Sequence, residues 1–183
     1  MSTQEELRTI ALAEFAAAGY SATSLQRIAE LAGVSKSSAL YHFASKEHLL
    51  EAAIGPAIDR MHVVLTPLEA ARGIDDPRAF LEAFVDFLLE YRLEVNMFIN
   101  QGPSLVDVPV IERANELVRR LAEFFAVNSD SLEEKMRFGI ALGGAAYMLC
   151  TVQNFGLPLA EEPDETRDVL ISILSDLLIP TQR

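Results

Sequence analysis

The sequence predicts an all-α protein of about nine helices, and three observations favour this fold class. Apolar residues recur at three- and four-residue spacing along most of the chain, which is the period of one helix face. No stretch alternates apolar and polar residues with the two-residue period of a half-buried strand. The nine glycines and eight prolines among the 183 residues lie mostly between the periodic stretches, where they can separate helices.

The N-terminal fifty residues predict three short helices and the start of a fourth. Helices are expected at 3–18, 24–31 and 36–42, with the fourth beginning near residue 46. Thr3 and Thr23 each begin the S/T-x-x-E/Q pattern of a capping box, and Ser35 and Ser45 are expected to cap the third and fourth helices. Gly19 stands where a glycine would end the first helix.

The rest of the chain predicts longer and more apolar helices. The fourth helix contains Gly55-Pro56, which should kink it or split it in two. Asp76 before Pro77 indicates an N-cap with proline at the first helical position, and Ser131 begins another capping-box pattern. Further helices are expected at about 77–93, 108–126, 132–153 and 164–179, with residues 94–107 less regular and residues 154–163 in a loop.

The short helices at the N-terminus have the pattern of a helix-turn-helix over residues 24–43. Ala29 is small where two helices must cross closely, and Gly33 suits a tight turn because it has no Cβ. The inner face is expected to hold Ile28, Val34 and Ala39. The exposed face of the third helix carries small or hydrogen-bonding residues: Lys36, Ser37, Ser38, Tyr41 and His42. Such a face lets a helix enter the major groove of DNA, where base edges are recognised.

A longer pattern of residues surrounds this motif. It consists of Gly19-Tyr20, Thr23-Ser24-Leu25, Ile28-Ala29, Ala32-Gly33-Val34-Ser35-Lys36, Tyr41-His42-Phe43 and Ser45-Lys46-Glu47 followed by Leu49. With this ungapped spacing, about residues 5–50, roughly a quarter of the chain, resemble the N-terminal domain of the TetR family of bacterial regulators. The resemblance implies a ligand-responsive transcriptional regulator, usually a repressor, that binds a palindromic operator as a homodimer.

The resemblance also implies which residues contact DNA: Thr23, Ser24, Lys36, Ser37, Ser38, Tyr41, His42 and Lys46. Lys36, Ser37 and Ser38 are the expected base contacts, and the other five are expected at the phosphate backbone. Three alternatives stay open. His42 could instead be a half-buried residue that caps the third helix, and Lys46 could be an ordinary solvated residue of the first turn. Tyr41 could belong to the core, as Phe43 is expected to.

The net charge of −12 is unfavourable for a protein that binds nucleic acid, because phosphate contacts need lysine and arginine. The charge is unevenly distributed along the chain. Residues 1–50 hold four basic and five acidic residues and carry −1, so residues 51–183 carry the other −11. We therefore expect a nearly neutral DNA-binding domain at 1–50 and an acidic effector-binding and dimerisation domain at 51–183. Each half-site should neutralise few phosphates, which predicts a shallow salt dependence.

The last two helices are the expected dimer interface. The segment from Phe138 to Ala146 is apolar nearly all round, and the last helix has a continuous apolar stripe. Two such helices from each chain would form a four-helix interface, although a purely intramolecular core is the alternative. The expected interface residues are Gly139, Gly143, Ala146, Leu170, Ile173, Leu174 and Leu177.

The middle helices are expected to bind the effector. They carry large apolar residues with scattered polar ones, which suits a small hydrophobic molecule, although ordinary core is the alternative for each residue. The expected lining is Phe84, Leu88, Tyr91, Met97, Phe98, Gln101, Tyr147, Cys150 and Asn154. Effector binding would tilt the fourth helix at Gly55-Pro56 and change the spacing of the two DNA-binding domains.

Other functions are weakly supported by the sequence. The three histidines occur without a metalloprotease, hydrolase or phosphate-loop motif, so we expect no catalytic residue, metal or cofactor. A helical small-molecule-binding protein without DNA binding is the alternative function. The N-terminus lacks the pattern of a signal peptide and the longest apolar run, Phe138–Val152, is too short to span a bilayer, so a cytoplasmic location is expected.

Overall fold

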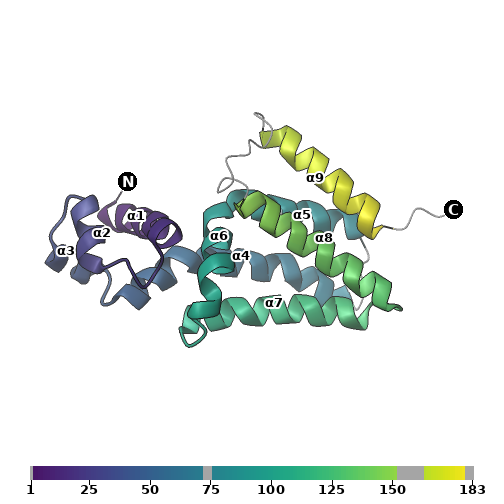
Figure 1. Cartoon of the computed structure of the whole chain (residues 1–183), viewed down its shortest axis with the longest axis horizontal. Coiled ribbons are helices and arrows are strands. Elements are labelled where there is room, and N and C mark those ends of the chain that lie inside the picture. The colour runs from purple at the N-terminus through teal and green to yellow at the C-terminus, as the bar shows by residue number, and fades with distance from the viewer. Residues whose placement is uncertain (1, 72–75, 152–162, 180–183) are drawn as a thin grey trace. The chain divides into compact units, whose positions relative to one another are not determined.

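The computed structural model describes residues 2–71, 76–151 and 163–179, and these residues form nine α-helices and one 3-10 turn, without a strand among them (Figure 1). The helices are α1 (Thr3–Ala18), α2 (Leu25–Leu31), α3 (Lys36–His42), α4 (Lys46–Ala71), α5 (Pro77–Glu90), α6 (Arg92–Gln101), α7 (Pro109–Val127), α8 (Leu132–Thr151) and α9 (Pro163–Leu178). The 3-10 turn η1 (Gly102–Ser104) joins α6 to the segment before α7. The all-α prediction is confirmed.

The chain divides into two compact units. The head unit consists of Met1–Ile58 and Leu93–Ala114, and the body unit of Asp59–Arg92 and Asn115–Arg183. Helix α4 begins in the head unit and continues into the body unit without interruption. The division of the chain by function at residue 50 stays a prediction.

The head unit is organised around the contacts of α1 with α2 and of α2 with α3. Its core contains fully buried side chains from each helix, among them Phe15, Ile28 and Leu49, together with Phe43 directly after α3. The turn between α2 and α3 depends on Gly33, whose φ of 66° lies in the left-handed region that other residues rarely adopt. This local backbone and the buried apolar contacts hold α3 at the surface of the unit.

Helix capping follows the sequence in most places. Ser35, Ser45 and Asp76 accept hydrogen bonds from the backbone N–H groups three residues later, so these predicted caps are confirmed. Two predicted caps are wrong by one position. Ser2 rather than Thr3 forms the capping box of α1. Ser24 rather than Thr23 caps α2, because the Thr23 hydroxyl instead donates a hydrogen bond to the carbonyl of Gly19, 2.9 Å away.

Two expectations about helix boundaries are wrong in compensating ways. Helix α4 is not split at Gly55-Pro56, since the buried contacts of the neighbouring Ile54 and Ala57 offset the backbone hydrogen bond that proline cannot make. The other expectation, a kink at this pair, stays a prediction. Conversely, residues 94–107 are not irregular, since most of them belong to α6 and η1. The described residues do form about nine helices, as expected. The count agrees because the additional helix α6 replaces the second half of the fourth helix that a split would have produced.

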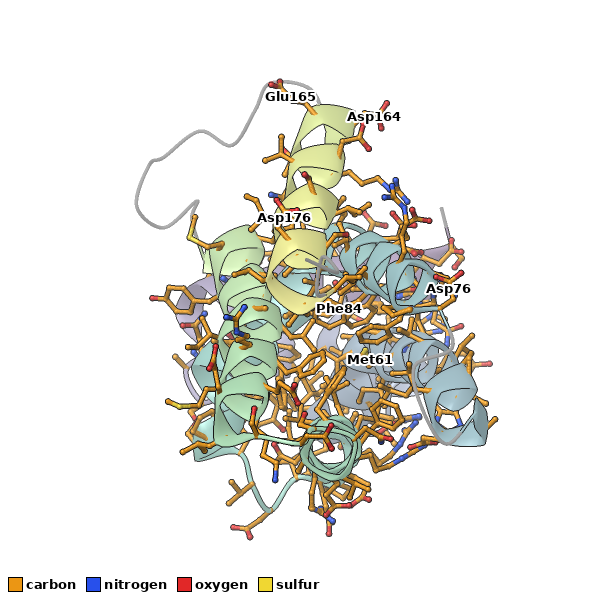
Figure 2. All side chains as sticks on the ribbon, turned by 90° about the vertical axis from the view of Figure 1, so that its right-hand side faces the viewer. Met61, Asp76, Phe84, Asp164, Glu165 and Asp176 are labelled. Atoms are coloured by element: carbon orange, nitrogen blue, oxygen red, sulfur yellow. The ribbon has the colours of Figure 1, made fainter. Side chains whose placement is uncertain are left out.

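The body unit is built on contacts of α5 with α8 and α9 and of α8 with α9. Phe84 points from α5 into the interior of the unit, whereas Asp164 and Glu165 project outward from the first turn of α9 (Figure 2). Aromatic rings join the helices further: Phe125 of α7 stacks on Phe138 of α8 with ring centroids 4.0 Å apart. No helix among the described residues has the length and hydropathy needed to cross a membrane.

Candidate nucleic-acid interface

Helix α3 presents a hydrogen-bonding face to solvent. Tyr41 is the most exposed of the large apolar and aromatic side chains described in the head unit, at 87%, and Lys36 and Ser37 are exposed beside it. Ser38 and His42 are half-buried, and the His42 ring meets the Tyr41 ring edge-on at 5.4 Å. The exposed face thus combines a cation, hydroxyls and an aromatic ring, which are groups that can bind both base edges and phosphates.

The opposite face of α3 fixes the helix in the unit. Ala39 is fully buried, as are Ile28 and Ala29 of α2, and Val34 in the turn is half-buried. The amide of Val34 donates to the carbonyl of Ala29 at 2.9 Å, which closes the turn after α2. Small residues at 29 and 39 let the two short helices approach closely, as the sequence predicts.

Three of the expected DNA contacts have side-chain polar atoms engaged within the head unit: Ser24, whose hydroxyl caps α2, and also Thr23 and Lys46. Thr23 is only 3% exposed, and its hydroxyl bonds to Gly19. The ammonium of Lys46 donates to the carbonyls of Tyr20 and Thr23 at 2.9 and 3.1 Å and lies 4.1 Å from the centroid of the Tyr20 ring. Lys46 is therefore not the solvated first-turn residue of the alternative interpretation. Sequence reasoning missed Tyr20 as its partner, because the contact joins residues 26 positions apart.

The charges of the head unit are sparse near α3. Lys36 forms no hydrogen bond or ion pair with the described residues, whereas Arg27 of α2 pairs with Glu14 of α1 at 3.5 Å. Burial raises the pKa of the Tyr20 phenol above its ordinary value, with a smaller contribution from the Glu47 carboxylate, so this ring is neutral. Lys36 is thus a cation without an ion-pair partner among the described residues, on the exposed face of α3. This agrees with the expectation that the head unit makes only a few phosphate contacts.

The expected dimer residues lie in different surroundings in the body unit. Gly139 and Gly143 are exposed, and a Cβ on either would meet no atom within 4 Å. Ile173 and Leu177 are exposed, Ala146 and Leu170 are half-buried, and Leu174 is buried in the single chain. Sequence reasoning missed an apolar stripe along α8, although its four-residue spacing is visible: Leu132, Met136, Ile140 and, after Gly144, Met148 are all exposed.

The expected effector-binding residues are divided between the two units. Met97, Phe98 and Gln101 belong to the head unit, and Met97 is fully buried. In the body unit Phe84, Leu88 and Cys150 are buried, Tyr91 is half-buried and Tyr147 is about half exposed. Asn154 lies outside the described residues. The Gln101 amide lies against the C-terminus of α1, 3.2 Å from the position that a Cβ on Gly19 would take. The effector site stays a prediction.

The tight turn at Gly33, the closely crossed α2 and α3 and the hydrogen-bonding face of α3 define a helix-turn-helix protein. Comparison with known proteins narrows this class. Residues 8–53 match the model of the family described as bacterial regulatory proteins, tetR family. A segment of 87 residues is 38% identical to the HTH-type transcriptional regulator RutR of Escherichia coli K12, and to RutR of Shigella flexneri. These matches identify residues 8–53 as a TetR-type N-terminal domain, and the chain is similar to bacterial transcriptional regulators of the TetR family.

The extent of these likenesses differs between sequence and structure. The segment matched to RutR covers 48% of this chain and 40% of RutR, less than half of either protein. KstR2 of Mycobacterium tuberculosis aligns over 97% of this chain and 93% of its own, with 16% identity and a TM-score of 0.66. SCO3833 of Streptomyces coelicolor aligns over 100% of this chain and 94% of its own, with 20% identity and a TM-score of 0.70. At such identities, the likeness to these structures establishes the fold alone.

Proposed function

We propose that the chain is a ligand-responsive transcriptional regulator that binds an inverted-repeat operator as a homodimer, and that it acts as a repressor released by a small hydrophobic effector. The observation that carries the proposal is the exposed face of α3, where Lys36, Ser37 and Tyr41 are free of the packing that buries Ala39 on the other side. A short helix with this face, held by a tight turn, has the geometry needed to enter a major groove.

Dimerisation through α8 and α9 is supported by their exposed apolar side chains. Ile140 is 68% exposed on α8, and Val169, Ile173 and Leu177 recur every four residues on α9, which packs beside α8. Large apolar side chains in such a row are disfavoured on a monomer and suit a helical interface between two copies. A homodimer would supply the two reading helices that an inverted repeat requires.

Selection of bound duplexes from random DNA, using the whole chain, tests DNA binding. We expect enrichment of an inverted repeat, and the enriched duplex then serves as the operator in titrations. Because few cations face outward from the head unit, the logarithm of the affinity should fall only shallowly with the logarithm of salt concentration. Failure to enrich any sequence would favour the alternative, a helical protein that binds small molecules without DNA.

A variant and a charge-matched control locate the DNA-binding surface. Lys36→Ala/Tyr41→Ala should weaken operator binding at least about tenfold, since contacts of this kind contribute roughly 1–3 kcal/mol each. Arg78→Ala removes a similarly exposed cation from α5, outside the head unit, and should leave the operator affinity unchanged. Equal effects of the two variants would mean that binding reflects overall charge rather than the face of α3.

Release by an effector is the least constrained part of the proposal. Its support is the family and the apolar interior of the body unit, where Phe84 and Leu88 are buried. A panel of hydrophobic and aromatic compounds, screened for dissociation of the operator complex, tests it. For any compound found, Gly55→Ala/Pro56→Ala tests whether α4 transmits the signal: a full response in that variant would remove the role proposed for this pair.

A further inference from the structure

Lys46 occupies an unusual position for a cation in the head unit. It is the first residue of α4, directly after the Ser45 cap, where the helix dipole disfavours positive charge. Its ammonium is nevertheless not left to solvent. It donates hydrogen bonds to two carbonyls that lie 23 and 26 residues earlier in the chain, at Thr23 and Tyr20. These contacts offset the unfavourable dipole and join the start of α4 to the connection between α1 and α2.

The connection that receives Lys46 is itself closely bonded. The Thr23 amide and hydroxyl both bond to the carbonyl of Gly19, at 3.2 and 2.9 Å. The Tyr20 ring, 8% exposed, packs on Phe15 with centroids 5.2 Å apart, and the ammonium lies 4.1 Å from its centroid. The ammonium thus bridges two carbonyls and the ring of Tyr20 in one turn. Its removal would take one donor from each carbonyl and leave the Tyr20 carbonyl with the Thr23 amide, 3.3 Å away.

We propose that Lys46 is a positioning residue for DNA binding: it fixes the α1–α2 connection, and through it the helix-turn-helix, rather than acting as a phosphate-contacting cation. The proposal rests on the proposed DNA-binding function and refines it. Lys36 provides the contrast, since it belongs to the same unit but bonds to none of the described residues. Removal of each lysine should therefore weaken DNA binding through a different physical effect.

Salt dependence separates the two effects. A lysine that neutralises a phosphate releases a counterion, so its loss lowers the slope of log affinity against log salt by about one. Lys46→Met should weaken binding to the selected operator by about tenfold, the scale of a lost charge-assisted hydrogen bond, and leave this slope unchanged. Lys36→Met should lower the slope. All titrations are made at a temperature where circular dichroism shows each variant fully folded.

A double-mutant cycle tests whether the effect passes through the connection. Tyr20→Leu removes the ring under the ammonium without removing a charge. If Lys46 acts through this turn, Tyr20→Leu also weakens operator binding, and Tyr20→Leu/Lys46→Met weakens it by less than the product of the single effects. Independent, multiplicative effects would overturn the proposal. So would a slope lowered by about one in Lys46→Met, or an unchanged operator affinity of the folded variant.

Hydrogen exchange of the free protein keeps the test separate from the proposed function. In Lys46→Met, peptides that contain residues 19–24 should lose protection in the absence of DNA, whereas Lys36→Met should leave them unchanged. If random-sequence selection yields no operator, the DNA-binding proposal fails while this measurement still reports on the turn. Unchanged protection in Lys46→Met would show that the lysine does not fix the connection, and would overturn the inference by itself.

Discussion

Two exposed helical surfaces of this molecule differ in chemistry. The outward face of α3 carries Lys36, Ser37 and Tyr41, all able to donate hydrogen bonds, on a helix of seven residues. The exposed surfaces of α8 and α9 include rows of large apolar residues such as Ile140 and Ile173, beside charged residues such as Glu133. The first surface matches a polyanion with patterned acceptors, and the second matches another apolar surface. This difference agrees with the proposal that the first surface binds DNA and the second binds another copy of the chain.

The largest expected effect comes from placing a charge on the apolar surface. Ile140→Asp should convert the proposed dimer to a monomer and weaken binding to the proposed inverted repeat about 100-fold, or about 3 kcal/mol, because the second half-site is no longer bound intramolecularly. Sedimentation and operator titration measure both effects. Val118→Asp is the matched control, since Val118 is exposed on α7 and should tolerate the charge. A variant that remains dimeric would assign the interface elsewhere.

The second effect concerns two glycines, Gly33 in the turn before α3 and Gly143 in α8. Gly33→Ala should lower the free energy of unfolding by about 1–2 kcal/mol, because its φ of 66° disfavours any Cβ although no atom lies within 4 Å. Gly33→Asn should lose less, since asparagine tolerates this region. At Gly143, in the middle of α8, an added Cβ also has no atom within 4 Å, and the backbone is helical. Gly143→Ala should therefore not lower the free energy of unfolding of the monomeric chain. Urea unfolding at low protein concentration compares them, and equal losses would refute this distinction.

The third effect compares two exposed tyrosines. Tyr41→Phe removes only a hydroxyl from the face of α3, so operator affinity should fall about fivefold, near 1 kcal/mol. Tyr147→Phe makes the same change on α8, where the neighbouring exposed side chains are apolar, and should change operator affinity less than about twofold. Direct titration of both variants measures this difference. If Tyr41→Phe binds the operator as tightly as the unchanged chain, the ring rather than the hydroxyl faces DNA.

The sequence predicted the polar surface better than the apolar one, for a physical reason. Caps such as Ser35 and Ser45, and the turn at Gly33, are local interactions whose partners lie three or four residues away. Helix α6 was missed because Asn96 and Asn100 interrupt its apolar period, although the Asn100 amide bonds to the Asn96 carbonyl within the helix. Periodicity detects burial, and α6 buries only one fully covered residue, Met97.

Long-range placement was beyond the sequence. The hydroxyl of Thr23 and the ammonium of Lys46 have residue types that suit phosphate contacts, and only the folded head unit shows them bonded to backbone carbonyls. In α8 and α9 the difficulty concerns apolar residues, whose burial the sequence does not determine. Leu174 and Ile173 are equally apolar in sequence, yet one is buried in the single chain and the other is exposed, because that choice depends on which helices pack against α9.

The smallest expected effect concerns the ion pair that links α9 to α5 in the body unit. Arg167 of α9 donates two hydrogen bonds to Asp86 of α5, at 2.5 and 3.0 Å. These bonds lower the pKa of the Asp86 carboxyl, against a smaller opposing effect of burial. The folded chain therefore binds this proton less tightly than the unfolded chain does. The stabilisation is present above the ordinary carboxyl pKa of about 4 and is lost as pH falls through the lower folded value.

Arg167→Met should consequently lower the free energy of unfolding by about 0.5 kcal/mol at neutral pH, since both side chains are partly exposed to solvent that screens the pair. The difference between Arg167→Met and the unchanged chain should shrink as the pH is lowered from 6 to 3 in urea titrations. Arg78→Met breaks the more exposed pair with Glu82 within α5 and controls for loss of a surface charge. If both variants lose the same stability, the Arg167 pair has no special part in holding α9, and apolar packing alone positions the surface proposed for the second copy.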